Sequence, residues 1–132
     1  MGAPLIDLLQ FTSVSAAVLD RARRRPRQIA VERPSVLGAA WEKISAASLG
    51  DAIRAAGLGW IGLGLEPGDA VSILGSTSYE WMVMDLGAQA AGLVTVPIYE
   101  TDSCEQVKWI TQKAQVKAVI TDSTVQANMI RQ

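Results

Sequence analysis

Three short apolar runs, separated by segments of helical composition, dominate the second half of the chain. The runs cover residues 70–74, 94–98 and 118–121, and the helical segments between them cover residues 79–91 and 107–114. An alternation of strand, helix and strand within about 30 residues is typical of a βαβ unit with parallel strands. The pattern therefore predicts an α/β fold, in which a parallel sheet with crossover helices (βαβαβ) and one final helix fill residues 66–132.

The first part of the chain predicts a leading helix within residues 1–28. The helical pattern covers residues 5–25, Thr12 or Ser13 can serve as an N-cap, and Pro26 ends the helix. Three residues form its expected apolar side: Val14, Ala17 and Val18.

Two short strand-like runs then predict a hairpin over residues 29–44. Ser45 is a good N-cap for the next helix, which together with a turn fills residues 45–65. Four apolar residues recur at i, i+4, i+7 and i+11 and predict one buried helix face: Leu49, Ile53, Ala56 and Trp60.

Glycines at positions 57, 59 and 62 match the spacing G-x-G-x-x-G of dinucleotide-binding loops. Such a loop follows a strand and opens a helix, so that the pyrophosphate meets backbone N–H groups at the helix start. Here the glycines follow a helical pattern and lead into a turn. We interpret them as a frayed helix end with glycine caps.

The helical segment 79–91 is apolar on nearly all sides, and Trp81 is expected to belong to the core. One face of such a helix can pack on the parallel sheet, whereas the other needs a cover. We expect that cover to come from outside the chain, which is then part of a larger domain or self-associates. The abrupt end of the sequence soon after residue 122 fits a chain that has been cut from a longer one.

The charge and composition exclude several classes of function. The net charge of −1 does not indicate nucleic-acid binding, and the basic run from Arg21 to Arg27 is interpreted as a solvated helix end. A membrane span is not expected, because no 18 consecutive residues are apolar. The sequence has no recognisable signal peptide and only one cysteine, so the expected location is the cytoplasm. A peripheral position at the inner face of the membrane is compatible with this expectation.

The chain has no histidine, which removes the commonest general base and zinc ligand. Ser103 and Gln106 form a capping box at a helix start. Cys104 lies in the first turn of that helix, where a reactive thiol is one interpretation and an incidental small residue is the default. We therefore assign no catalytic, cofactor-binding or metal-binding residue to this chain.

Three segments of the sequence are Gly-Asp-Ala-Val-Ser-Ile-Leu at 68–74, Ser-Tyr-Glu-Trp at 78–81 and Ala-Gly-Leu-Val-Thr-Val-Pro-Ile-Tyr-Glu-Thr at 91–101. In this order they resemble the adenylate-forming (AMP-binding) superfamily, and in particular the N-terminal part of a long-chain fatty acid–CoA ligase. The resemblance runs from about Val14 to Asp122. Upstream, Arg-Pro at 25–26, Ala-Val at 30–31, Trp41 and Ile-Ser at 44–45 fit the family's opening hairpin and helix.

The resemblance implies that residues 1–132 are part of one larger N-terminal domain of such a ligase. The family joins a fatty acid to coenzyme A with ATP and Mg²⁺, through an acyl-adenylate. Its phosphate-binding loop lies downstream of the region matched here, and residues 75–78 are interpreted as a strand-to-helix turn. We therefore expect the chain to be structural, inactive alone and free of bound ATP, Mg²⁺ or coenzyme A.

Two alternatives of other classes remain open at this point. One is a standalone α/β interaction or regulatory module without catalysis, and the other is a small nucleotide-binding protein of doubly wound type. The position of the glycines at 57–62 counts against the second. A Ser/Thr/Gly-rich loop ending in Pro-Lys-Gly, encoded downstream, would distinguish the ligase from the module.

Overall fold

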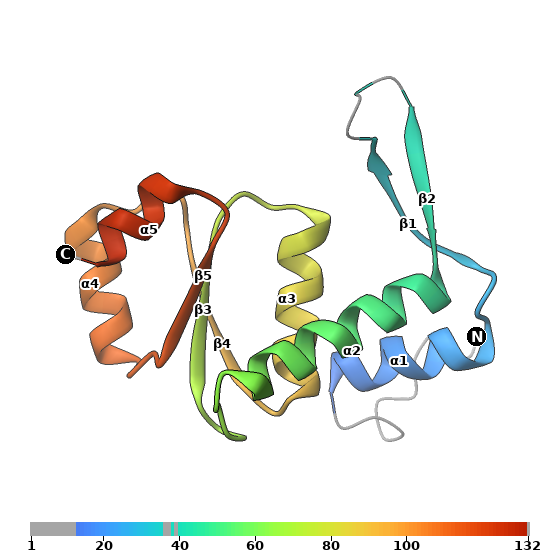
Figure 1. Ribbon diagram of the computed structural model, residues 1–132, viewed down its shortest axis with the longest axis horizontal. Coiled ribbons are helices and arrows are strands. Elements are labelled where there is room, and N and C mark those ends of the chain that lie inside the picture. The colour runs from blue at the N-terminus through green and yellow to red at the C-terminus, as the bar shows by residue number, and fades with distance from the viewer. Residues whose placement is uncertain (1–12, 36–37, 39, 132) are drawn as a thin grey trace, which may run out of the picture. The chain divides into compact units, whose positions relative to one another are not determined.

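The computed structural model describes residues 13–35, 38 and 40–131 and divides the chain into two compact units, Met1–Ala52 and Ile53–Gln132. Each unit is described by itself. The predictions for residues 5–12, including Thr12 as a cap, lie outside the described residues. The order of helices and strands can be followed in Figure 1.

Helix α1, Val14–Arg24, opens the first unit where the sequence predicts a helix. Ser13 caps it, because the Ser13 hydroxyl oxygen accepts a hydrogen bond from the backbone N–H of Ala16 at 3.1 Å. Pro26, which has no N–H to donate, follows shortly after its last turn. The predicted cap and the predicted end of this helix are therefore both confirmed.

The apolar side predicted for α1 is wrong at Val14, which is 65% exposed. The buried positions are instead Ser15 and Ala22, which lie two turns apart and therefore on one face. Burial of Ser15 is tolerated because its hydroxyl shares a hydrogen bond of 2.9 Å with the Ser13 hydroxyl. The buried side of α1 therefore carries small residues.

Strands β1 (Ile29–Pro34) and β2 (Trp41–Ser45) form the predicted hairpin as a two-stranded antiparallel sheet. The register places Arg33 opposite Glu42, and their side chains form an ion pair with 2.9 Å between Nε and Oε2. Cross-strand pairs of this kind each add a little to the stability of a sheet. The predicted hairpin is therefore confirmed, and the Arg33–Glu42 ion pair is an additional finding of the structure.

Helix α2, Ala46–Gly62, begins in the first unit and continues in the second. Ser45 caps it as predicted, since the Ser45 hydroxyl oxygen accepts a hydrogen bond from the Ser48 N–H at 3.1 Å. The predicted apolar face is confirmed, with three buried members and one half-buried member: Leu49, Ile53, Trp60 and Ala56.

The glycines at 57, 59 and 62 lie within α2, so their interpretation as a frayed helix end with glycine caps is wrong. The chain turns out of the helix at Gly64, which has a φ of +81°. Glycine is the usual residue for this left-handed conformation after a helix. The segment also differs from a dinucleotide loop, because it continues a helix where such a loop joins a strand to a helix start.

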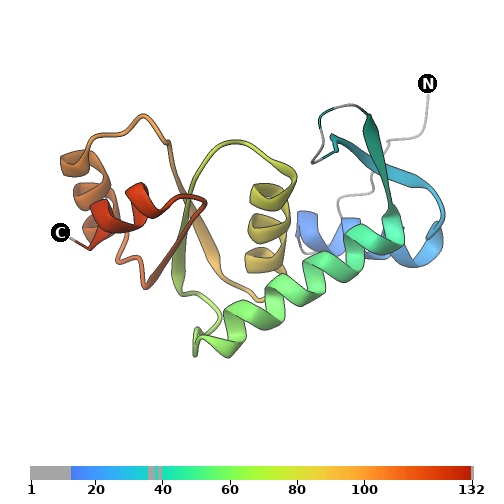
Figure 2. The same ribbon diagram turned by 45° about the horizontal axis from the view of Figure 1, so that its top comes forward.

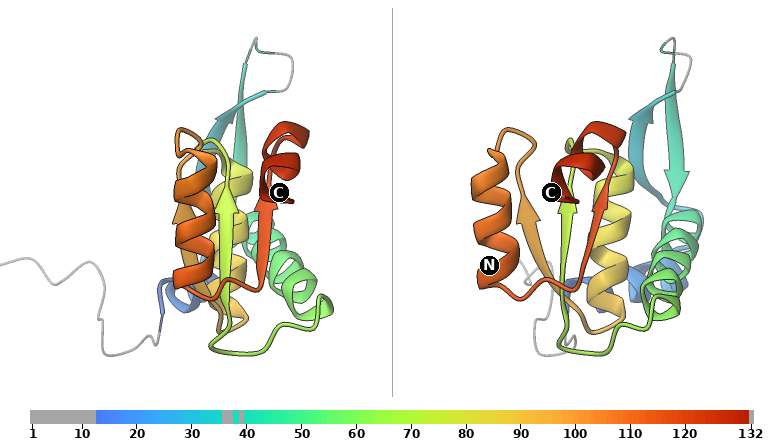
Figure 3. Two further views of the ribbon diagram at one scale, coloured as in Figure 1. Left: turned by 90° about the vertical axis from the view of Figure 1, so that its left-hand side faces the viewer. Right: turned by 60° about the vertical axis from the view of Figure 1, so that its left-hand side comes forward.

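A three-stranded parallel sheet with the order β4-β3-β5 is the base of the second unit. Its elements are β3 (Ala70–Leu74), α3 (Tyr79–Ala90), β4 (Val94–Ile98), α4 (Cys104–Lys113), β5 (Ala118–Thr121) and α5 (Thr124–Ile130). Figure 3 shows the three strands pointing in the same direction. The predicted βαβαβ arrangement with a final helix is confirmed.

The helices of the second unit cover both faces of this sheet, α3 on one face and α4 and α5 on the other (Figure 1). Val71 and Ile73 of β3 pack with Ala88 of α3. Leu74, on the opposite face of the same strand, packs with Val107 of α4. The chain leaves β3 in one direction to form β4 and then crosses β3 to form β5, so right-handed crossovers place α3 and α4 on opposite faces.

Helix α3 receives a cover from within the second unit, which differs from the expectation that its cover must come from outside. Within α3, all residues except Glu80 and Ala90 are buried or half-buried. The C-terminal half of α2 meets α3 at Gly57 and Gly87, where an ideal Cβ built on Gly57 would lie 3.1 Å from the Gly87 carbonyl oxygen (Figure 2). The two glycines therefore allow the backbones of α2 and α3 to approach closely.

Trp60 on α2 is the largest fully buried side chain among the described residues, with 1% exposure. Its indole N–H donates a hydrogen bond of 3.1 Å to the backbone carbonyl of Met84 on α3. Trp81, which the sequence predicts as core, is only half-buried at the edge of the same cluster. The interface between α2 and α3 is therefore centred on Trp60.

An ion pair fastens the amino ends of β3 and β5 to each other. Lys117 Nζ lies 2.6 Å from Asp69 Oδ1, and the other Asp69 oxygen accepts a hydrogen bond from the Glu66 N–H at 2.9 Å. The hydrogen bond from the Glu66 N–H has the larger effect and the interaction with Lys117 the smaller one, and together they keep the pKa of Asp69 below its ordinary value of 3.8. Asp69 in turn raises the pKa of Lys117 above 10.5.

We expect the Asp69 interactions to make stability depend on pH in the acid range. A pKa that is lower in the folded state stabilises the fold above the unfolded pKa, and this contribution is lost as the pH falls through the folded value. Asp69→Asn should therefore lower the urea midpoint at pH 7, and this difference from the unaltered chain should shrink below pH 3.8. A difference that stays constant from pH 7 down to the acid range would contradict the assignment.

Candidate functional site

The carboxyl ends of the three parallel strands meet at one edge of the sheet in the second unit. Three connections lie there: residues 75–78 after β3, 99–103 after β4 and 122–123 after β5. In doubly wound sheets, ligands bind outside this edge at the point where the crossovers change direction. In this sheet that point lies between β3 and β5.

A chain of hydrogen bonds links these three connections. The Ser76 N–H donates to Asp122 Oδ2 at 3.1 Å, and the Ser76 hydroxyl donates to Glu100 Oε2 at 2.7 Å. Ser123, and not Asp122, caps α5, because its hydroxyl oxygen accepts a hydrogen bond from the Gln126 N–H at 3.1 Å. Asp122 is thereby free to hold the turn after β3.

A side chain at position 75 would meet the Asp122 carboxylate at the end of β3. An ideal Cβ on Gly75 would lie 2.8 Å from Asp122 Oδ2 and 2.9 Å from its Cγ, closer than real Cβ contacts. From the sequence, Glu100 has no predicted role, and Asp122 is predicted only as an alternative to Ser123 for the cap of the last helix. The signal that could have identified them is their position directly after the second and third strands of a parallel sheet.

A cavity of about 170 Å³ opens beside this hydrogen-bonded chain, at the carboxyl ends of β3 and β5. Trp81, Met84 and Ile120 contribute apolar side chains to its lining, and Ser76 and Asp122 contribute polar ones. A dry apolar cavity of roughly 150 Å³ is large enough for a benzene-sized molecule. The cavity can thus accept a small apolar group, with hydrogen-bonding groups on one side.

The turn at residues 75–78 does not fit a triphosphate. A phosphate site needs free backbone N–H groups and, in most cases, a cation. Here the Ser76 N–H is bonded to a carboxylate, and the Ser78 hydroxyl caps α3 by accepting a hydrogen bond from the Trp81 N–H at 3.0 Å. Glu100 and Asp122 add negative charge, so the predicted role of this segment as a strand-to-helix turn is confirmed.

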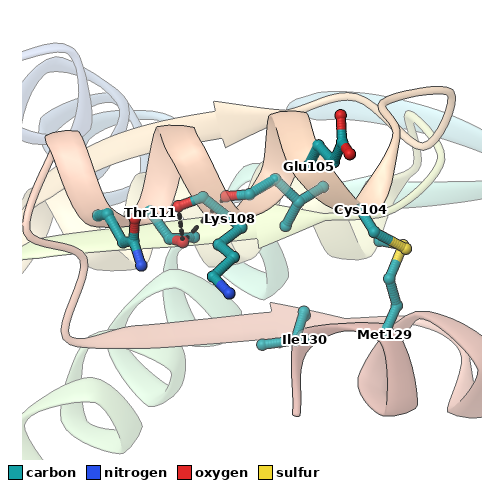
Figure 4. A pocket seen from close by; sticks show the side chains of 8 residues that line it. Cys104, Glu105, Lys108, Thr111, Met129 and Ile130 are labelled. Atoms are coloured by element: carbon teal, nitrogen blue, oxygen red, sulfur yellow. Dashed lines mark hydrogen bonds between the residues drawn. The ribbon is translucent and has the colours of Figure 1, made fainter. Parts of the chain in front are cut away.

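A second hollow, of about 380 Å³, lies between α4 and α5, and Figure 4 shows Cys104 and Met129 on its two sides. Ser103 caps α4 through both bonds of the predicted capping box, with Gln106 as the partner. Cys104 follows this cap and is exposed. The chain contains no histidine that could act as an imidazole base for this thiol, and we assign no chemistry to it.

Among residues 13–35, 38 and 40–131, no group of three or more His, Cys, Asp or Glu side chains is arranged to hold a metal ion. None of the helices in the same part of the chain has both the length and the apolarity needed to cross a membrane.

Comparison with known protein families supports the sequence resemblance. Residues 18–132 match the family described as AMP-binding enzyme. The chain is 37% identical over 121 residues to long-chain-fatty-acid–CoA ligase FadD15 of Mycobacterium bovis. It is 36% identical over 95 residues to long-chain-fatty-acid–CoA ligase ACSBG2 of Xenopus laevis.

The matched region is a small part of these relatives. The first alignment includes 92% of this chain but only 20% of the Mycobacterium bovis ligase, and the second includes 72% of this chain and 13% of the Xenopus laevis ligase. The chain thus spans about a fifth or less of the length of these curated relatives.

Solved structures agree with the fold. The N-terminal domain of FACL13 from Mycobacterium tuberculosis superposes with a TM-score of 0.80 at 25% identity, over 92% of this chain and 29% of that one. A Mycobacterium tuberculosis fatty acyl CoA synthetase superposes with a TM-score of 0.78 at 26% identity, over 89% of this chain and 22% of that one.

Proposed function

The chain belongs to the AMP-binding enzyme family, and we propose that the intact protein is an ATP-dependent long-chain fatty acid–CoA ligase. The observation that carries this proposal is the family match over residues 18–132 together with relatives named as long-chain-fatty-acid–CoA ligases. The substrates are then a fatty acid, ATP and coenzyme A, and the products are acyl-CoA, AMP and diphosphate.

The proposed reaction proceeds in two steps. The fatty acid carboxylate displaces diphosphate from ATP to give an acyl-adenylate, and the thiol of coenzyme A then displaces AMP. Mg²⁺ on the phosphate oxygens would neutralise the charge that develops in the first step. The carboxylates at the β3–β5 edge do not suit these phosphates, so no step is placed on this chain.

We assign the chain a structural role in that enzyme. Its parallel sheet would form one layer of a larger N-terminal domain, of which all 132 residues are a part. Two observations support this role: the turn after β3 is closed by Asp122, and the chain contains no histidine to act as a general base. The groups that hold ATP and coenzyme A would lie in the rest of the protein.

Self-association and location complete the proposal. We place the enzyme in the cytoplasm, with access to the inner face of the membrane. Isolated chains would associate through the open edges of β4 and β5 and through an exposed apolar stripe at the end of α2, and not through α3 as the sequence indicated. The stripe consists of Leu58, Ile61 and Leu63.

An assay of released AMP and diphosphate tests both parts of the proposal. With a series of saturated fatty acids, ATP, Mg²⁺ and coenzyme A, the intact protein should release AMP only when a fatty acid is present. The 132-residue chain alone should release none and should show no heat of ATP binding in calorimetry.

The two parts fail independently. Diphosphate release by the isolated chain would refute its purely structural role while leaving the ligase assignment intact. An intact protein that releases no AMP with any fatty acid would refute the ligase assignment and favour the interaction module without catalysis.

A further inference from the structure

The cavity of about 170 Å³ at the carboxyl ends of β3 and β5, here the edge cavity, has an apolar lining that is still partly open to water. Trp81 and Met84 lie one turn apart on α3, and Ile120 of β5 adds a third apolar side chain to the lining. All three are half-buried and pack against the core cluster of the second unit from its edge. An occupant of the edge cavity would therefore remove apolar surface from water, which favours binding.

The polar part of the lining offers hydrogen-bond acceptors and no cation. Glu80 and Asp122 contribute carboxylates and Ser76 and Ser78 contribute hydroxyls, whereas none of the described residues that line the edge cavity is a lysine or an arginine. Asp122 is exposed and forms no ion pair within the described part of the chain. The edge cavity therefore combines apolar walls with uncompensated negative charge.

Neutral donors hold the Asp122 carboxylate in place without cancelling its charge. The Ser76 N–H donates a hydrogen bond to Oδ2 at 3.1 Å. The Gln126 side-chain amide, with its nitrogen turned toward Asp122, donates to Oδ1 at 3.0 Å. A carboxylate has about four acceptor positions, so capacity remains for a ligand. Asp122 is thus a charged acceptor whose orientation is fixed before a ligand arrives.

We propose that the edge cavity binds a small organic ammonium ion with an apolar body of about the size of a benzene ring. The body lies against Trp81, Met84 and Ile120, and the ammonium group donates a hydrogen bond to Asp122. The volume sets the size of the body, because a dry apolar cavity of roughly 150 Å³ holds benzene. The charge sets the head group, since a charge-assisted hydrogen bond is about twice as strong as a neutral one. Trp81 adds to this preference, because the face of an indole ring attracts a cation.

Other classes of ligand suit the edge cavity less well. A carboxylate or phosphate would be repelled by Glu80 and Asp122, which share the lining. A bare metal ion would leave the apolar walls unused, and the described residues contain no group of three or more side chains arranged to hold one. A neutral alcohol of the same shape would fill the space but would form only a weaker hydrogen bond to Asp122. The site is also separate from the ligase reaction, of which no step is placed on this chain.

Calorimetric titration of the intact protein with benzylamine and with benzyl alcohol tests the proposal. The two probes have the same ring and differ in the head group. At pH 7 an alkyl amino group is protonated, as in the side chain of lysine. Benzylamine should therefore bind about tenfold more tightly than benzyl alcohol, because its hydrogen bond to Asp122 is ionic.

Asp122→Asn separates the effect of charge from the effect of shape. Asparagine keeps an oxygen that accepts the Ser76 N–H but has no charge. The variant should weaken benzylamine binding about tenfold and leave benzyl alcohol binding within about twofold. Asp102→Asn is the matched control, because Asp102 also accepts a backbone N–H, from Tyr99 at 3.0 Å, but does not line the edge cavity. It should leave both affinities within about twofold.

Several results would overturn the proposal: no heat of binding with benzylamine, equal affinities of the unaltered protein for the two probes, or equal losses of benzylamine binding in the two asparagine variants. Loss of both probes in Asp122→Asn would show that Asp122 maintains the shape of the edge cavity. The comparison of the two probes with the unaltered protein then decides. Because the titration contains neither ATP nor coenzyme A, its result is separate from that of the AMP-release assay.

Discussion

Replacement of Trp60 by alanine should lower the free energy of unfolding by about 3–5 kcal/mol, the range for large aromatic residues removed from a core. Trp60 is 1% exposed and packs with Leu65 and Val71, so its removal opens a cavity between α2 and the sheet-facing cluster. The change also removes the indole N–H that donates to the Met84 carbonyl at 3.1 Å. Urea unfolding followed by circular dichroism measures the effect without relying on the four tryptophans as reporters.

Two further variants separate the effect of removing a buried side chain from the effect of removing any tryptophan. Trp109 is 61% exposed, so Trp109→Ala should change the free energy of unfolding by less than about 0.5 kcal/mol. Trp60→Phe keeps most of the apolar volume but loses the hydrogen bond, and should cost about 1–3 kcal/mol. Equal effects of the alanine variants at 60 and 109 would show that α2 is not packed against α3 as described.

Most of the fold of the second unit could be predicted because its signals are local. The apolar runs at 70–74, 94–98 and 118–121 became the three strands, and the segments between them became helices. The caps at Ser45 and Ser103 were predicted equally well, since a serine before a helical pattern bonds only to residues within one turn. The resemblance to the AMP-binding superfamily, based on the same segments, is confirmed by the family match.

The features that could not be predicted depend on residues far apart in the sequence. The glycines of α2 were interpreted as caps because nothing local shows that Gly57 faces Gly87 of another helix. For the same reason a cover for α3 was expected from outside the chain. Val14 was assigned to the buried side of α1 by its hydrophobicity, whereas the small residues Ser15 and Ala22 take that side.

The candidate site shows the same limit. Ser76 bonds to Glu100 and Asp122 across separations of 24 and 46 residues, and no spacing rule connects them. The topology does connect them, because each acidic residue directly follows a strand whose carboxyl end lies at one edge of the sheet. A sequence reading that lists the residues after each predicted parallel strand would have found both.

Gly87→Ala is expected to destabilise the chain, although the same change in an open helix is stabilising. An ideal Cβ at 87 would lie 2.5 Å from the Ala56 Cβ and 2.9 Å from the Gly57 nitrogen. The Gly57 nitrogen is a backbone atom, so α2 and α3 would have to move apart. Overpacking of this kind costs about 1–3 kcal/mol or more, which exceeds the roughly 0.5–1 kcal/mol that alanine gains over glycine within a helix.

Gly59→Ala is the matched control, because Gly59 lies in α2 with no atom within 4 Å of an ideal Cβ. There the same substitution should raise the free energy of unfolding by about 0.5–1 kcal/mol. The two variants should thus differ in sign in one urea-unfolding experiment.

Gly87→Ala combined with Ala56→Gly should lower the free energy of unfolding by less than the sum of the two single changes. The double variant removes the nearest clash, which is with the Ala56 Cβ, while the close contact with the Gly57 backbone stays. Stabilisation by both Gly87→Ala and Gly59→Ala would mean that α2 and α3 do not cross at Gly57 and Gly87. In that case α2 would not cover α3.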